Sequence, residues 1–523
     1  MKPESGEGTP TPGAPEFYTR DDVRSDDHSP PGTFPYTRGI RAVRRGSWIQ
    51  RGLSGEGDAR HSNAQIKALL ERGQTGIDVI GDSPTMGLMD PDSPFARSAV
   101  GSQGVSLCCL EDYRELLDGL PLGSMTISSS VPAPFFIAGL VLVARERGVP
   151  LDGLRGSVLQ PPFYTEDCGY AMHLPFALRM RLACDSIEYC SQLLPRFHGF
   201  LEDTYFFSEV GLTPAEEMAL GFLEIKHVCQ ELVRRGLEID RFAPRIAILV
   251  NCSMSLFHEV AKIRATRRLF AKMMRDEFGA RDPRSHSVAI TSHTSGLSLT
   301  AQQPVNNVVR GALQAMALVM AGVQALEISA FDEGYRTPGP EAHLVGLRTQ
   351  QILDLETDVG QAVDPLGGSH FVEHLTDEME REIRSIMAGF EARGTPEQLC
   401  ERGVFAAFFA EAMDRRQRAL STGELKQVGV NVHRLPPEED RLLRGEAEAK
   451  GRTWQQVIQR SLERKRARDP DAVKRGLDEM ANAARDRHRN LMPPLIAAMG
   501  DGLTMGEIAR ALKRGYGLHE EKP

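Results

Sequence analysis

RIAILVNCS (245–253), SVAITSHTSG (287–296) and ALEISAF (325–331) are three short runs of strand-forming residues. The segments between them, Leu256–Phe278 and Asn306–Met320, have the apolar spacing of amphipathic helices. Strands that alternate with helices of this length indicate βαβ units, in which neighbouring strands are parallel. This part of the chain therefore predicts a parallel sheet that is covered by helices.

The same alternation extends upstream, where three more strand-like runs occur: GIDVIGD (76–82), SMTISSSV (124–131) and LRGSVLQ (154–160). A further helix is predicted from Thr213-Pro214 to about Arg235, because Glu216 completes a capping box with Thr213. Alternation over this length favours an α/β fold of the (β/α)8 TIM-barrel type over an open doubly wound sheet.

Composition changes divide the chain into three predicted parts. Residues 1–33 are rich in Pro, Gly and acidic residues and are expected to form a flexible tail. Residues 34–394 carry the alternation and form the barrel. Residues 395–523 contain dense Arg, Glu and Lys with helical spacing and are interpreted as a helical appendage that docks another subunit.

Bulk properties exclude several classes of function. The net charge of −9 argues against a nucleic-acid surface, which needs a basic patch. No uninterrupted apolar segment is long enough to span a membrane, and no secretory leader is apparent, so a cytoplasmic protein is expected. The eight cysteines form no CxxC pair, and no metal site is predicted.

Three strand-like runs carry unusual hydroxyl or amide side chains at every second position. These are Thr126, Ser128 and Ser130; Asn251, Ser253 and Ser255; and Ser292 and Thr294. Alternate residues share one face of a strand, so inward-facing sets would leave an open, hydrogen-bonding lumen that accommodates a thin amide-bearing chain such as pantetheine. The alternative is that these hydroxyls only cap strand ends and turns.

Several runs together resemble the large subunit of the methylmalonyl-CoA mutase family, nearly in register from Tyr36 to Gly517. They are PYTRGI (35–40), SMTI (124–127), LRG (154–156), IEYC (187–190), FAPR (242–245), SLTAQQP (298–304), FDE (331–333), LRTQQI (347–352), DPLGGS (364–369) and NLMPPLI (490–496). The resemblance implies a radical 1,2-rearrangement of an acyl-CoA that is threaded through the barrel. It also implies adenosylcobalamin on a separate small subunit, in a hetero-oligomer of two large and two small chains.

Some functional positions of the family are retained. The resemblance implies that Tyr205 lies beside the cofactor and that Glu333 holds its adenosyl ribose. It implies a CoA-phosphate contact for Arg51, and Lys262 and Arg264 in AKIRATRR are candidates for the same anionic end, unless they form a solvated helix face. Thr126, Ser128 and Ser253 are candidates for contacts along the pantetheine.

Other positions differ from the family. The Tyr, Gln, Arg and His that contact the acyl group are replaced by Leu53, Leu159, Gly169 and Phe206, respectively. The family's HTQ reads Thr291-Ser292-His293, and the Asn of HTNSFDE reads Ser329, which remains a candidate cofactor contact. His293 is a candidate replacement for the missing donor to the thioester carbonyl, although a structural role is the alternative.

These replacements predict a larger, uncharged acyl pocket, because a substrate carboxylate would be buried without its Arg and Tyr partners. Ile80 stands where relatives acting on 2-hydroxyisobutyryl-CoA have an Asp, which disfavours a hydroxylated substrate. The favoured hypothesis is an adenosylcobalamin-dependent isomerase for a non-carboxylated, branched or bulky apolar acyl-CoA. A catalytically retired structural or regulatory subunit, and an enzyme that performs another reaction on CoA esters, are the alternatives.

Overall fold

The strands form one parallel sheet in a computed structural model that describes residues 17–24, 27, 29–43, 46–96, 98–160, 162–164, 174–436, 439–440 and 453–518. Its hydrogen-bonded order is β1-β9-β8-β7-β6-β5-β4-β3-β2. The strands are β1 (Ile49–Arg51), β2 (Leu53–Ser54), β3 (Gly76–Val79), β4 (Thr126–Ser129), β5 (Arg155–Leu159), β6 (Phe197–Asp203), β7 (Ile246–Val250), β8 (Ala289–His293) and β9 (Ala325–Glu327).

The sheet closes into a barrel at Gly52. β1 pairs with β9 and β2 pairs with β3, yet only Gly52 separates β1 from β2 in the chain. The two segments therefore act as one interrupted strand, and the nine segments make eight barrel positions. The predicted (β/α)8 TIM-barrel fold is confirmed.

All six predicted strand runs contain a strand, namely β3, β4, β5, β7, β8 and β9. The interrupted strand at 49–54 and β6 were not anticipated. The first is split by a glycine, and the sequence of β6, FHGFLED, contains a glycine and ends on two acidic residues. Both therefore lack the β-branched runs that mark a buried strand.

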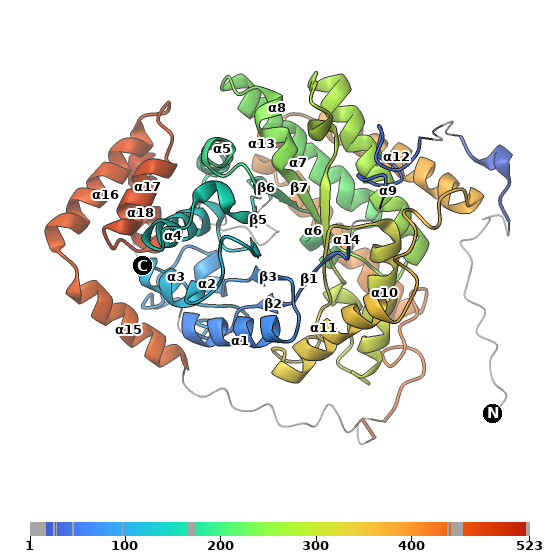
Figure 1. The fold of residues 1–523 in the computed structure, drawn as a ribbon, viewed down its shortest axis with the longest axis horizontal. Coiled ribbons are helices and arrows are strands. Elements are labelled where there is room, and N and C mark those ends of the chain that lie inside the picture. Colours follow the sequence, from blue (N-terminus) through green and yellow to red (C-terminus); the bar gives the residue numbers. More distant parts are fainter. Residues whose placement is uncertain are drawn as a thin grey trace.

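Helices follow the strands and cover the outside of the barrel (Figure 1). The capping box at Thr213 is present at the start of α7, where the Glu216 carboxylate accepts from the Thr213 amide at 2.8 Å. The helices of this layer are α1 (Ala59–Glu71), α2 (Ser83–Met86), α3 (Leu110–Leu117), α4 (Ala133–Glu146), α5 (Phe176–Leu193), α6 (Tyr205–Glu209), α7 (Pro214–Arg234), α8 (Ile239–Phe242), α9 (Leu256–Lys272), α10 (Asn306–Ala321) and α11 (Pro340–Leu355).

The C-terminal helices pack on two different parts of the barrel. One apolar core joins the helices around β6 to β9 with α12 (His370–Glu391), α13 (Pro396–Glu401) and α14 (Val404–Thr422). A second core joins α1, α3, α4 and α5 with α16 (Pro470–Arg485), α17 (Met492–Gly500) and α18 (Met505–Gly515). The predicted appendage therefore does not form one unit, and its proposed role in subunit docking stays a prediction.

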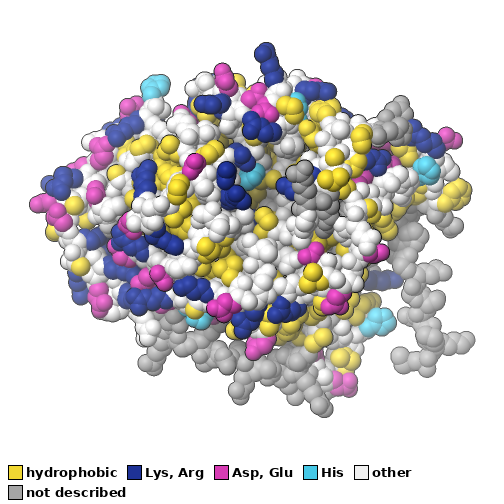
Figure 2. Space-filling model, viewed as in Figure 1, with side chains coloured by type: hydrophobic (Ala, Val, Ile, Leu, Met, Phe, Trp, Pro, Cys, Tyr) yellow, Lys and Arg dark blue, Asp and Glu magenta, His cyan; other side chains and the backbone are white. Residues whose placement is uncertain are grey.

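Ion pairs connect helix α15 (Thr453–Ala467) to the barrel. Arg464 forms ion pairs with Asp112 and Glu115, and Lys465 lies 2.7 Å from Asp92. Figure 2 shows acidic and basic side chains interspersed on the side of the molecule where α15 to α18 lie. Arg464 and Lys465 therefore bind the chain's own carboxylates.

The predicted tail is in contact with the barrel over part of its length. His374 of α12 lies 2.8 Å from the carbonyl oxygen of Asp22, and the rings of Tyr18 and Phe371 lie 4.9 Å apart. Residues 1–16 lie outside the described residues. Residues Tyr18 and Asp22 thus contact α12, and the expectation of a flexible tail over 1–33 stays a prediction. None of the described helices has the length and apolar character needed to cross a bilayer.

Candidate active site

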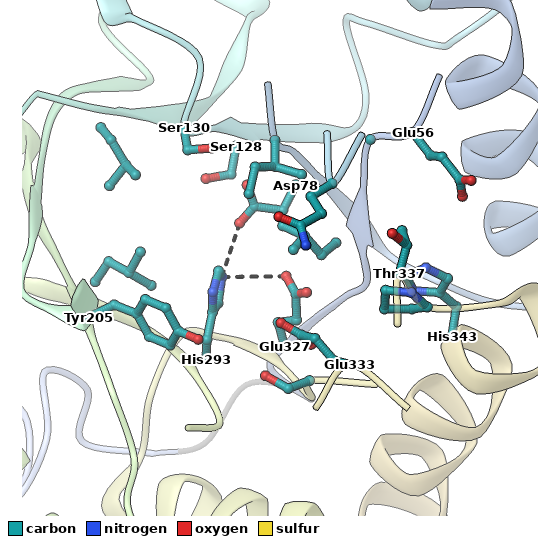
Figure 3. Close-up of a pocket in the computed structure, with 18 of the residues that line it drawn as sticks. Glu56, Asp78, Ser128, Ser130, Tyr205, His293, Glu327, Glu333, Thr337 and His343 are labelled. Atoms are coloured by element: carbon teal, nitrogen blue, oxygen red, sulfur yellow. Dashed lines mark hydrogen bonds and ion pairs between the residues drawn. The ribbon is translucent and has the colours of Figure 1, made fainter. Parts of the chain in front are cut away.

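A cavity of about 380 Å³ opens at the carboxyl ends of the strands (Figure 3). This is the end at which barrel enzymes carry their active sites. Nine of the residues selected from the sequence line it: Leu53, Ile80, Ser128, Leu159, Tyr205, Phe206, His293, Ser329 and Glu333. The structure therefore brings together the predicted acyl pocket and the predicted catalytic residues.

The lumen has a polar side and an apolar side. Ser128 of β4 and Ser130, directly after that strand, face the cavity, and the Ser128 hydroxyl lies 2.7 Å from that of Ser157 on β5. Leu159, Leu201 and Leu249 form a small apolar cluster on β5, β6 and β7, the strands next to β4 in the barrel. The prediction of inward hydroxyls is thus confirmed for β4 alone.

The other hydroxyl runs do not face the cavity. Ser253 lies beyond the end of β7, where its hydroxyl donates to the Glu259 carboxylate at 2.6 Å. On β8, Ser292 points out of the barrel and donates to the carbonyl oxygen of Val250 at 2.9 Å, while His293 points inward. Ser253 is therefore corrected from a lumen contact to a strand-end cap, the alternative that the sequence left open.

A layer of side chains fills the lumen beneath the cavity. Arg51 is buried there, with Nη1 3.4 Å from the Thr291 hydroxyl and 4.0 Å from Asp78 Oδ2. Arg51, Thr126 and Thr291 do not line the cavity, so in the described part of the chain it ends above this layer. Arg51 therefore lies away from the cavity and its role as a phosphate contact stays a prediction, while Thr291 lies below the acyl pocket.

Lys262 is wrongly predicted as a ligand for the anionic end of CoA. Its Nζ lies 2.8 Å from Glu217 and 2.6 Å from Glu259, and all three side chains are buried. These carboxylates raise the pKa of Lys262 despite its burial. The charge is satisfied inside the protein and has no access to a ligand.

Arg264 is corrected for the same reason. Its guanidinium is buried and pairs with Asp364 and, at 2.7 Å, with Glu373. These partners tie α9 to α12 and to the segment before it. The remaining acyl-pocket residue, Gly169, lies outside the described residues.

Tyr205 and Glu333 face the cavity from opposite sides of His293 (Figure 3). Burial raises the pKa of Tyr205 well above its ordinary value, so the phenol stays protonated. Glu333 is accessible from the cavity but surrounded by protein, and burial together with the charge of Glu209 raises its pKa to about 7. Ser329 donates to the carbonyl oxygen of Thr294 at 2.8 Å.

Asp78 and Glu327 are functional candidates that sequence reasoning missed. His293 Nε2 lies 3.3 Å from Asp78 Oδ2 and 3.4 Å from Glu327 Oε2. A signal was available, because each is the one charged residue of its strand, β3 or β9. Buried charges need partners, so the two carboxylates and His293 could have been expected to meet in the lumen.

The ligand atoms of these three side chains lie within 4.8 Å of one another, as in a metal site. However, the Arg51 guanidinium lies 4.0 Å from Asp78 and would repel a cation. We therefore interpret the cluster as an ion pair network around His293.

The cavity is acidic, which corrects the prediction of an uncharged pocket. Asp78, Glu209, Glu327 and Glu333 line it. Within the described residues Arg336 is the one Lys or Arg in the lining, and it pairs with Asp332 at 2.8 Å. The loss of Arg and Tyr is visible in the sequence, whereas the meeting of these carboxylates depends on the fold.

Comparisons with known proteins identify the family of the chain. The family model described as methylmalonyl-CoA mutase matches residues 13–518. The chain is 33% identical to the 2-hydroxyisobutanoyl-CoA mutase large subunit of Aquincola tertiaricarbonis, covering 97% of this chain and 91% of that protein. It is 33% identical to the methylmalonyl-CoA mutases of Rhizobium meliloti (strain 1021), covering 97% and 72%, and of Escherichia coli (strain K12), covering 93% and 68%. The chain therefore belongs to the methylmalonyl-CoA mutase family, as a large-subunit member with a divergent active site.

Proposed function

We propose that this chain is the large subunit of an adenosylcobalamin-dependent mutase that rearranges the carbon skeleton of a non-carboxylated acyl-CoA. The observation that carries the proposal is the cavity at the barrel mouth, which combines Tyr205, His293 and Glu333 with an apolar wall. The alkyl part of the acyl group lies against Leu159, Leu201 and Leu249, where it loses contact with water.

The charge of the cavity supports the exclusion of dicarboxylic acyl groups. A substrate carboxylate would lie among Asp78, Glu327 and Glu333. Of the described lining residues, Arg336 is already paired with Asp332, and His293 with Asp78 and Glu327. Burying an unpaired anion beside like charges costs several kcal/mol. A neutral acyl chain pays no such cost.

The residues at the mouth fit the nucleoside part of the cofactor. The Glu333 carboxyl is open to the cavity and can accept from ribose hydroxyls, and the protonated Tyr205 lies beside it. Adenosylcobalamin, when bound, supplies the radical that removes a hydrogen atom from the acyl group. The chain's own residues bind, orient and shield the acyl-CoA. The cobalamin-binding small subunit, the pairing of two large with two small chains, and a cytoplasmic location belong to this proposal.

The test combines the chain with a cobalamin-binding small subunit of the family and adenosylcobalamin. Cob(II)alamin is then followed by electron paramagnetic resonance on addition of isobutyryl-, butyryl-, pivaloyl-, 2-hydroxyisobutanoyl- or methylmalonyl-CoA. We expect the signal with a non-carboxylated substrate and not with methylmalonyl-CoA. A signal with methylmalonyl-CoA alone would contradict the proposed pocket.

A catalytically retired subunit is the second candidate, because Phe206 and Leu53 line the cavity where the family has its His and Tyr. The same experiment separates the two functions. If the chain forms a complex with the small subunit but no acyl-CoA produces cob(II)alamin, the result supports a catalytically inactive subunit.

A further inference from the structure

The charged cluster in the lumen has a defined geometry around one imidazole nitrogen. Asp78 comes from β3, His293 from β8 and Glu327 from β9, so the cluster spans the barrel interior. The exposed fractions of the three side chains are 8%, 13% and 5%. Both carboxylates face Nε2, which is drawn with two dashed lines in Figure 3.

This arrangement fixes the charge and orientation of His293. Burial opposes protonation of the imidazole, but Glu327 and Asp78 outweigh it and raise the pKa of His293 to about 9. Arg51 faces Asp78 from β1, Asp203 adds negative charge from β6, and Glu333 lies across the cavity. Burial raises the pKa of Glu327 to about 8 although His293 lowers it, so the imidazole is the more basic of the two groups and keeps its second proton at neutral pH.

The second nitrogen of His293 is left for a ligand. Among the described residues, none forms a hydrogen bond with Nδ1 of His293, and this side chain lines the cavity. The ring of Tyr205 lies 5.2 Å from that of His293 and 5.3 Å from that of Phe206. The Tyr205 ring thus contacts both His293 and Phe206. Phe206 has no hydrogen-bond donor in its side chain, whereas His293 has one.

We propose that Asp78 and Glu327 are positioning residues that hold His293 as a cationic donor to the thioester carbonyl of the bound acyl-CoA. The inference rests on the proposed function in that the ligand is an acyl-CoA, and it assigns roles to two residues beyond it. With Nε2–H directed at the carboxylates, Nδ1–H is directed at the ligand. A donor that is already charged and fixed needs no reorganisation when negative charge builds up on the carbonyl oxygen.

The first measurement concerns the imidazole itself. Histidine labelled with 13C at Cε1 is titrated by nuclear magnetic resonance in the full chain, and the His293 signal is identified by its loss in His293→Gln. We expect a midpoint near pH 9 in the unaltered protein. Asp78→Asn and Glu327→Gln each move it down by about one unit or more, because each removes one of the charges that stabilise the imidazolium.

The second measurement compares butyryl-CoA with S-butyl-CoA, a thioether in which a methylene replaces the carbonyl. Calorimetry on the full chain gives both affinities. A hydrogen bond from a charged donor predicts that the thioester binds about tenfold more tightly or better. Only the thioester shifts the His293 signal, and Asp78→Asn, Glu327→Gln and His293→Gln reduce the preference to about twofold.

The matched control is Glu380→Gln, which removes a buried carboxylate from its pairs with Arg268 and Lys272 outside the lumen. It keeps the thioester preference and the His293 midpoint even if it lowers stability. Retention of the full preference in Asp78→Asn and Glu327→Gln overturns the inference, as does an equal signal shift with the thioether. If either variant fails to fold, the ligand comparison in the unaltered protein still decides.

The outcomes also separate the inference from the proposed function. Equal, measurable binding of thioester and thioether overturns the role of His293 and leaves the acyl-CoA site intact. Failure of both ligands to bind overturns the acyl-CoA site and the inference with it.

Discussion

Lys262→Met tests whether the buried lysine is structural or binds CoA. The substitution keeps most of the side-chain volume but leaves Glu217 and Glu259 buried without their shared cation, and the carbonyl oxygen of Asn251 loses its donor at 2.8 Å. Removing one partner of a buried ion pair costs about 3–5 kcal/mol in the free energy of unfolding. We expect a loss of this size at pH 8, measured by urea unfolding followed by circular dichroism.

The loss should depend on pH in a defined direction. Burial already raises the pKa of Glu217 to about 7 although Lys262 opposes the shift, so removing Lys262 raises it further. A carboxyl with a raised pKa in the folded state binds more protons than in the unfolded state, and stability then falls as pH rises. The destabilisation should therefore grow from pH 5 to pH 8.

The matched control is Lys67→Met on α1, whose ion pair with Asp118 is largely exposed. It should change stability by less than about 1 kcal/mol. The reasoning is refuted if Lys262→Met keeps its urea midpoint within the range of this control while its affinity for CoA falls more than tenfold. That result would place Lys262 at the anionic end of the ligand.

Three further predictions concern the cavity, the appendage and the imidazolium. Leu249→Ala removes part of the apolar wall and should lower the free energy of unfolding by about 2–4 kcal/mol. It should also raise the affinity of hexanoyl-CoA relative to butyryl-CoA, measured by calorimetry. An unchanged ratio of the two affinities would contradict the assigned wall. Arg464→Ala removes the ion pairs with Asp112 and Glu115, so trypsin should cleave α15 earlier than in the unaltered chain. Equal cleavage rates would show that these ion pairs do not hold the helix against the barrel. Because the pKa of His293 is raised, its stabilising contribution is complete below about pH 6.5 and is lost as pH rises through about 9. The melting temperature should therefore fall over this pH range more steeply than in His293→Gln. Parallel curves of melting temperature against pH would contradict the raised pKa.

Alternation of strands and helices was sufficient to predict the barrel, because this pattern is a local property of the chain. The run at β7, IAILV, is apolar throughout and largely β-branched, and the helix Leu256–Lys272 follows it. β1 and β2 have only three and two residues and flank a glycine. Their strand character comes from pairing with β9 and β3, which are distant in sequence.

The errors at Lys262 and Arg264 have one physical cause. A helix with several basic residues looks like an anion site when only the helix is considered, because such residues are normally exposed. Lys262 also pairs with Glu259 on its own helix, but the partners from other elements, Glu217 and Glu373, are 45 and 109 residues away in sequence. No local pattern contains that pairing.

The direction of side chains on β8 could not be fixed from the sequence either. Ser292 and His293 are both polar, so alternation alone does not say which faces inward. The register of β8 with β9 places His293 opposite Glu327, and this pairing decides the face. A charge-based rule applied to Asp78, His293 and Glu327 together would have found the cluster.

The second apolar core has a consequence for how the protein is made. Met480, Leu495 and Ile508 are buried in the same core as Phe136, which belongs to a strand–helix unit translated much earlier. That part of the barrel leaves the ribosome before α16, α17 and α18 are synthesised. Until then, the apolar surface that these helices cover is exposed to water. Chaperones are therefore expected to hold the nascent chain until the last helices arrive, and a premature stop after residue 470 should yield aggregates in place of a shortened enzyme.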